Sequence, residues 1–166
     1  MSWSDRRGVL LALAALPLAA GCGFSPALGR GRSAAALRGR IRAQDPTDSA
    51  GFELVARLEE RLGAPGPDAF ELSYALSLRE QTLARVRGIG ESRGQVAGTL
   101  RYQIRKPGAA GVLQSGTLRN FAGYSRSSTP LANRAAQEDA RRRLMRMLAD
   151  DLVAELILTA SNWTVA

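Results

Sequence analysis

The chain of 166 residues holds a single cysteine, Cys22, and no histidine. Ser-His and Cys-His nucleophiles and histidine-ligated metal sites are therefore excluded. A lysine or paired-carboxylate mechanism is not excluded by these counts. However, the only lysine, Lys106, stands beside Pro107 and Gly108 in a segment typical of a turn. We therefore expect a protein that is not an enzyme and has no catalytic residues, metal or other cofactor.

Cys22 follows a segment with the features of an export signal. Asp5-Arg6-Arg7 precedes an apolar run from Val9 to Ala20, and small residues stand directly before the cysteine. A basic start, a short apolar run and small residues define a secretory signal peptide. The run is shorter than the roughly 20 residues that a membrane-spanning helix needs. The sequence predicts a signal peptide over residues 1–21, exported by either the Sec or the twin-arginine route.

The residues around Cys22 resemble the lipobox of bacterial lipoproteins, whose cysteine is acylated and becomes the mature N-terminus. This resemblance implies acyl chains, palmitate among them, on Cys22, and two or more chains suffice for stable membrane attachment. In the Gram-negative sorting pattern an aspartate after the cysteine retains the protein at the inner membrane. Gly23 therefore implies the outer membrane, with the domain on the periplasmic side. A plain signal peptide followed by a free or buried thiol is the alternative.

Arginine dominates the charge of the chain. The basic residues number 23 and the acidic residues 15, which gives a net charge of +8. Guanidinium groups make planar, bidentate contacts with phosphate and carboxylate. An exported protein rarely meets nucleic acid, so we expect lipid phosphates, on lipid A or phospholipids, as the anionic ligands. A genome that encodes arginine in place of lysine would give the same composition without any binding role.

Period-2 alternation of apolar and polar residues predicts four strands in a domain that follows a tether. Residues 22–36 are rich in Gly, Pro, Ser and Arg and are expected to be a lipidated, flexible tether, and residues 37–166 a single domain. The predicted strands are Leu37–Ala43, Phe70–Arg79, Val96–Ile104 and Val112–Tyr124, the last with the least regular alternation.

Two segments have helical features. Asp48 or Ser49 can cap a short amphipathic helix over Ala50–Leu62. Thr129-Pro130 is typical of a helix start, and the residues after it allow a helix of about 30 residues, which Asn162 can end. The predicted fold is α+β, with two helices packed on one face of a mostly antiparallel four-stranded sheet.

Several pieces of the chain carry a family resemblance when taken in order. They are Cys22–Pro26 after the signal, Tyr74–Leu78, Ala97–Ile104, and Ser115–Ser125 leading into Ala135–Leu144 and Leu148–Leu152. Together they resemble the lipopolysaccharide-assembly lipoprotein family, LptE. This resemblance implies a lipoprotein that sits as a plug inside LptD, the outer-membrane barrel of the lipopolysaccharide translocon. Such a protein assists folding of the barrel and binds lipopolysaccharide.

The implied lipopolysaccharide binding needs guanidinium groups directed at lipid A phosphates. We expect a cluster on one face of adjacent strands, and the candidates are Arg85, Arg87, Arg93, Arg101 and Arg105. The alternative is that these arginines face the barrel wall or solvent. A run of three arginines, residues 141–143, is expected to form a solvated band on the long helix.

Two other functions compete with the plug. One is a structural or chaperone-like periplasmic lipoprotein that serves a different outer-membrane client. The other is a lipoprotein hydrolase, which the absence of histidine disfavours. A detergent-stable one-to-one complex with a large β-barrel would distinguish the plug from both.

Overall fold

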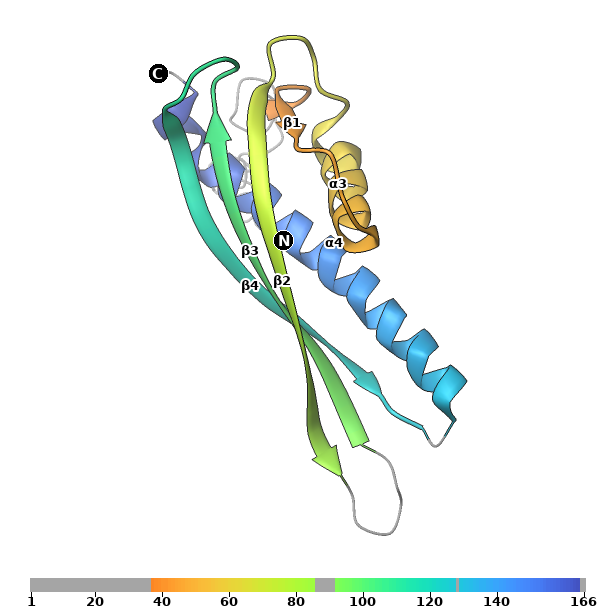
Figure 1. The fold of residues 1–166 in the computed structure, drawn as a ribbon. Coiled ribbons are helices and arrows are strands. Elements are labelled where there is room, and N and C mark those ends of the chain that lie inside the picture. The colour runs from red at the N-terminus through yellow and green to blue at the C-terminus, as the bar shows by residue number, and fades with distance from the viewer. Residues whose placement is uncertain (1–36, 86–91, 128, 165–166) are drawn as a thin grey trace, which may run out of the picture.

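The computed structural model describes residues 37–85, 92–127 and 129–164 of the chain. Its four strands form one sheet in the order β1-β2-β3-β4, in which β1 is parallel to β2 and the other pairs are antiparallel. Two helices, α3 and α4, lie on one side of this sheet (Figure 1). The predicted α+β architecture is confirmed. The elements are β1 (Ile41–Ala43), α3 (Ser49–Leu62), β2 (Phe70–Arg85), β3 (Ser92–Arg105), β4 (Val112–Ser125) and α4 (Pro130–Trp163).

The core lies between the sheet and the long helix α4. On β3 the buried residues alternate with exposed ones, so that Val96, Leu100 and Ile104 all point toward the helices. Gly98 occurs in the same row, and α4 packs directly against it. A Cβ atom built on Gly98 would lie 3.0 Å from the Leu148 side chain, so the glycine permits this close approach.

Two other strand glycines lie under tyrosine rings of the neighbouring strand. Tyr102 of β3 is paired with Gly116 of β4, and a Cβ atom on Gly116 would lie 2.6 Å from the ring. Tyr124 of β4 covers Gly94 of β3 in the same way. Each ring therefore occupies the space that its partner's side chain would need, which explains glycine inside two long strands.

The first strand is shorter than the sequence predicted. Leu37–Ala43 was expected to be extended, but only Ile41–Ala43 forms β1. Gly39 adopts a φ of 68°, and the Arg40 N–H donates to the Leu37 carbonyl at 3.1 Å in a turn. A residue with positive φ interrupts an extended chain, so the basic alternation of this segment does not become one long strand.

The short helix α3 begins where the sequence predicted. Asp48 is the N-cap, and its carboxylate accepts a hydrogen bond of 2.6 Å from the Gly51 N–H. Its buried face is formed by Leu54, Leu58 and Leu62, whereas Phe52 is 64% exposed. Val55, which lies beside this face, is only partly buried.

Helix α4 begins at Pro130, as predicted, and is 34 residues long, or about 51 Å. The prediction that Asn162 ends it is wrong. The helix continues through Trp163, and the N–H of Thr164 donates to the Ala160 carbonyl at 2.9 Å. Trp163 is buried, with its ring edge-on to Phe70 at a centroid distance of 5.2 Å, so core packing extends this end of the helix. None of the helices in the described ranges is long and apolar enough to cross a bilayer.

Candidate functional site

The side of the sheet away from α3 and α4, here called the open face, is covered by no element that the structure describes. On β3 the open-face residues are the odd-numbered ones, which alternate with the buried row. They comprise Arg93, Gln95, Ala97, Thr99, Arg101, Gln103 and Arg105. Along β3 the open face is thus polar and basic.

Most arginines of α3 and α4 are bound to carboxylates. Arg57 of α3 donates to Asp150 of α4 at 3.0 Å, and its bonds to Asp150 and Glu60 raise its pKa. Arg141 pairs with Glu80 of β2. These contacts join the two helices to each other and α4 to the sheet.

The band at residues 141–143 is exposed, as expected for solvated side chains, but each of its arginines has an acidic partner. Arg142 and Arg143 both pair with Asp139, one turn earlier in α4. Arg143 also donates to the Gly123 carbonyl of β4 at 2.9 Å. The band therefore has a structural role in holding α4 to the sheet.

The arginines of the open face have no such partners. Arg79, Arg93, Arg101 and Arg119 are all exposed, and none forms an ion pair with a residue that the structure describes. Uncompensated guanidinium groups on one surface attract anions. These four guanidinium groups are therefore available to a ligand on this side of the sheet.

The three predicted arginines whose side chains are described share a face but do not form one cluster. Arg93, Arg101 and Arg105 lie along β3, where the rise per residue separates Arg93 from Arg101 by about 26 Å. Arg105 donates to Gln103 at 2.6 Å. The backbone of Arg85 pairs with Ser92 at the end of β2, and its side chain is outside what the structure describes. Arg87 and the lipidation candidate Cys22 lie outside the described residues.

The pairing of β3 with β4 brings together two arginines, one of which was not predicted. Arg101 lies opposite Thr117, and Thr99 lies opposite Arg119. Arg101 and Arg119 are therefore diagonal neighbours on the open face, with a separation of about 7–8 Å that long side chains can bridge. The irregular alternation of the β4 segment hid Arg119. Only the strand register shows that it lies beside Arg101.

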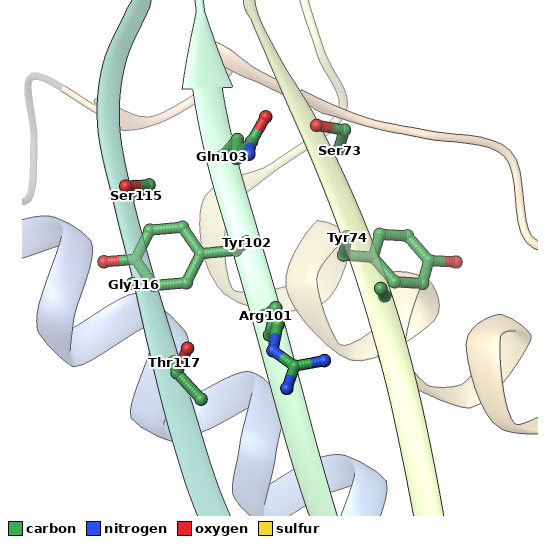
Figure 2. A pocket seen from close by; sticks show the side chains of 9 residues that line it. Ser73, Tyr74, Arg101, Tyr102, Gln103, Ser115, Gly116 and Thr117 are labelled. Atoms are coloured by element: carbon green, nitrogen blue, oxygen red, sulfur yellow. The ribbon is translucent and has the colours of Figure 1, made fainter.

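A shallow hollow of about 440 Å³ adjoins Arg101 on the open face. Figure 2 shows Arg101 and Gln103 of β3 between Ser73 of β2 and Ser115 and Thr117 of β4. Hydroxyl, amide and guanidinium groups all donate hydrogen bonds to oxyanions. No group of three or more metal-ligating side chains occurs in the described part of the chain. The arrangement is suited to an anionic headgroup lying flat on the sheet.

A model of the lipopolysaccharide-assembly family, LptE, matches residues 39–156. The chain belongs to the LptE family. The matched residues include all of β1 to β4, α3 and most of α4. No curated protein sequence gives a significant match.

Solved structures share the LptE-family fold at low sequence identity. A candidate lipoprotein of Caulobacter crescentus CB15 superposes with a TM-score of 0.62 at 19% identity, over 78% of this chain and 95% of the other. Rare lipoprotein B of Shewanella oneidensis gives 0.54 at 17% identity, over 74% and 95%. A minor lipoprotein of Acinetobacter baumannii gives 0.54 at 17%, over 70% and 87%. These similarities establish the fold alone.

Proposed function

We propose that this LptE-family protein is an outer-membrane lipoprotein that binds lipopolysaccharide on the open face of its sheet. The observation that carries the proposal is the pair Arg101 and Arg119. The two guanidinium groups are diagonal neighbours, exposed, and without an acidic partner among the described residues. Like charges held this close repel each other, and a bound anion relieves that repulsion.

The phosphates of lipid A are the anions that fit this pair best. A charge-assisted hydrogen bond from guanidinium to phosphate contributes about 1.5–3 kcal/mol. The hydroxyl groups of Ser115 and Thr117 lie beside Arg101 in the hollow and supply further donors (Figure 2). A flat, open surface also suits a ligand whose acyl chains must remain outside the protein.

The same protein acts as a plug for an LptD-like β-barrel and assists its assembly. The lumen of an outer-membrane barrel is polar, and the open face offers a polar, basic surface of matching character. Acyl chains on Cys22 anchor the protein to the periplasmic side of the outer membrane. Neither role requires an enzymatic activity.

The lipopolysaccharide site is tested by removing the unpaired guanidinium groups. We expect Arg101→Ala combined with Arg119→Ala to weaken binding of purified lipopolysaccharide to the full chain in detergent by about tenfold or more. The matched control is Arg141→Ala, which removes an exposed arginine that is paired with Glu80 on the helical side. Equal affinities of the double variant and the unaltered protein would refute the site.

The barrel partner and the anchor need separate measurements. We expect the protein to leave detergent-solubilised membranes in a one-to-one complex with a large β-barrel. Cys22→Ala should remove the anchor without unfolding the domain, so any variant still found with membranes would be held by its barrel partner. Recovery of the domain alone, together with unchanged surface lipopolysaccharide after depletion, would refute the plug.

A further inference from the structure

The sheet has two outer edges, one formed by the short β1 and, beyond it, by β2, and the other by β4. The two edges differ in how their backbone groups are used. In β2 the Phe70 N–H donates to the Arg40 carbonyl at 2.7 Å, and the Leu72 carbonyl accepts from the Gln44 N–H at 2.8 Å. Even-numbered residues of β2 therefore direct their N–H and carbonyl groups away from β3. The register with β3 continues without a shift as far as Thr82, so this direction holds for Tyr74, Leu76, Leu78 and Glu80.

These outward groups of β2 have no partner that the structure describes. The short strand β1 covers β2 only as far as its pair Ala43 and Leu72. Beyond that point no backbone or side-chain hydrogen bond from a described residue reaches the outward groups of the four residues. Figure 1 shows that β2 continues well past the end of α3. An unpaired edge of this length is a template for another strand.

The edge of β4 is blocked by side chains at Phe121 and Gly123, whereas its outward groups from Ser115 to Arg119 have no hydrogen-bond partner among the described residues. The Phe121 N–H donates to the side-chain oxygen of its neighbour Asn120 at 2.8 Å, and Asn120 is held by Asp151 of α4 at 2.8 Å. Two residues further on, Arg143 occupies the carbonyl of Gly123 at 2.9 Å. An added strand would have to displace both contacts, and it would lie beside the carboxylate of Asp151. Blocking of this kind is one way in which proteins protect sheet edges.

The side chains along the β2 edge define what could pair with it. On the helical side Leu76 and Leu78 are only partly buried, which leaves apolar area for an added strand to cover. On the open face Ser73, Ala75, Ser77 and Arg79 offer one positive charge and no negative one. A second copy of this chain would bring its own positive charge to the same face, in a molecule with a net charge of +8.

We propose that the free edge of β2, from Tyr74 to Glu80, binds an extended segment of a partner protein as a fifth strand of the sheet. The segment alternates apolar residues, which cover Leu76 and Leu78, with residues that include a carboxylate opposite Arg79. Main-chain hydrogen bonds to β2 provide affinity, and the alternating side chains provide specificity. This docking site is separate from the Arg101–Arg119 pair and does not depend on lipopolysaccharide binding.

The site is tested with a capped peptide in which valine alternates with aspartate, added to the full chain in detergent. We expect the amide hydrogens of Leu76 and Leu78 to exchange about tenfold more slowly with saturating peptide, because they become donors to the added strand. The amide of Thr117, on the β4 edge, should be unaffected. A peptide N-methylated on the residues that face β2 should not bind. Equal binding of the methylated peptide would overturn the proposal.

Substitutions in β2 separate the contribution of backbone hydrogen bonds to peptide affinity from the contribution of the Arg79 charge. Leu78→Pro removes an outward N–H and should weaken peptide binding by about fivefold relative to Leu78→Ala, which keeps that N–H. Thr117→Pro, the matched change on β4, should leave the affinity unchanged. Arg79→Glu should weaken the aspartate peptide and strengthen one in which lysine replaces aspartate. Loss of binding in Thr117→Pro, no binding at all, or dimerisation of the chain without peptide would each refute the proposed site.

Discussion

The two faces of the same sheet use neighbouring residues in opposite ways. Toward the helices, Leu100 is fully buried and Gly98 is in contact with α4. One residue further on, Arg101 is exposed and has no charged partner among the described residues. The helical side also holds the arginines that are paired with carboxylates, such as Arg141 with Glu80. Arginine content alone therefore says little about function in this protein.

What distinguishes the two groups of arginines is the position of the acidic residues. Asp139, Asp150 and Glu80 bind arginines around the helices, where each pair ties two elements or two turns together. On the open face Arg79, Arg93, Arg101 and Arg119 lie opposite strand residues with hydroxyl or small side chains. Arg105 is the exception, because it lies opposite Glu71. The arginines that are paired with carboxylates thus contribute to the fold, and the unpaired arginines of the open face are expected to bind the ligand.

The largest expected difference between the faces is in stability. Leu100→Ala should lower the free energy of unfolding by about 2–5 kcal/mol, because it leaves a cavity against α4. Arg101→Ala, at the adjacent residue, should change the free energy of unfolding by no more than about 0.5 kcal/mol. Urea denaturation of both variants measures the difference. Similar losses would mean that the open face is covered by part of this chain.

A smaller difference in stability is expected between alanine substitutions of two glycines of β4. Gly116→Ala should destabilise the fold by about 1–3 kcal/mol, because its Cβ atom would meet the Tyr102 ring. A Cβ atom on Gly123 would point to the open face, where the nearest atom is the Gly94 carbonyl oxygen at 3.9 Å. Gly123→Ala should therefore leave the free energy of unfolding almost unchanged. Thermal unfolding of the two variants tests this. If Gly123→Ala were the more damaging change, the assignment of the two faces would be wrong.

The smallest expected effect is on the pH dependence of stability, and it comes from Tyr102, the tyrosine whose ring covers Gly116. Burial raises the pKa of Tyr102, so its folded-state pKa lies above the unfolded value of about 10. Its contribution to stability is present below that unfolded pKa and is lost as the pH rises through the folded pKa, because the unfolded chain then binds fewer protons. Tyr102→Phe should therefore reduce the alkaline loss of stability, measured as the urea midpoint between about pH 8 and pH 11.

At neutral pH the same variant provides the control. The Tyr102 hydroxyl is buried and makes no hydrogen bond of good geometry with a described residue, although the Gln114 side chain lies near it. Removing it should leave stability unchanged or raise it by up to about 1 kcal/mol. Tyr74, whose pKa is raised by burial and then by Asp48 and Asp45, remains and continues to contribute an alkaline loss. A clear loss of stability at neutral pH would show that the hydroxyl has a partner in solution.

Local patterns predicted most of the fold. Alternation placed β2, β3 and β4, the Thr129-Pro130 step placed the start of α4, and Asp48 was one of two predicted caps. The failures have tertiary causes. The turn at Gly39 shortens β1, and the packing of Trp163 against Phe70 carries α4 beyond Asn162. Neither the φ of one glycine nor a contact between distant aromatic residues is encoded in local alternation.

The candidate site was less predictable than the fold. Alternation along the predicted strand that begins at Val96 indicated a polar face with Arg101 and Arg105, and the structure adds Arg93 to the same row. The expectation of a single cluster did not allow for the length of the strand, and Arg119 was missed because its proximity to Arg101 depends on the register of β3 with β4. The separation of paired from unpaired arginines depends on contacts such as that of Arg141 with Glu80, which are distant in sequence.

Helix α4 is the last described element in chain order, and it supplies much of the cover for the sheet. The strands β2, β3 and β4 are sequential neighbours and can pair as soon as they are synthesised. Their apolar face, however, stays open to water until Leu144 and Leu148 arrive. A nascent chain in that state is prone to aggregate and is a substrate for chaperones. We therefore expect docking of the final helix to be the step that commits this protein to its native state.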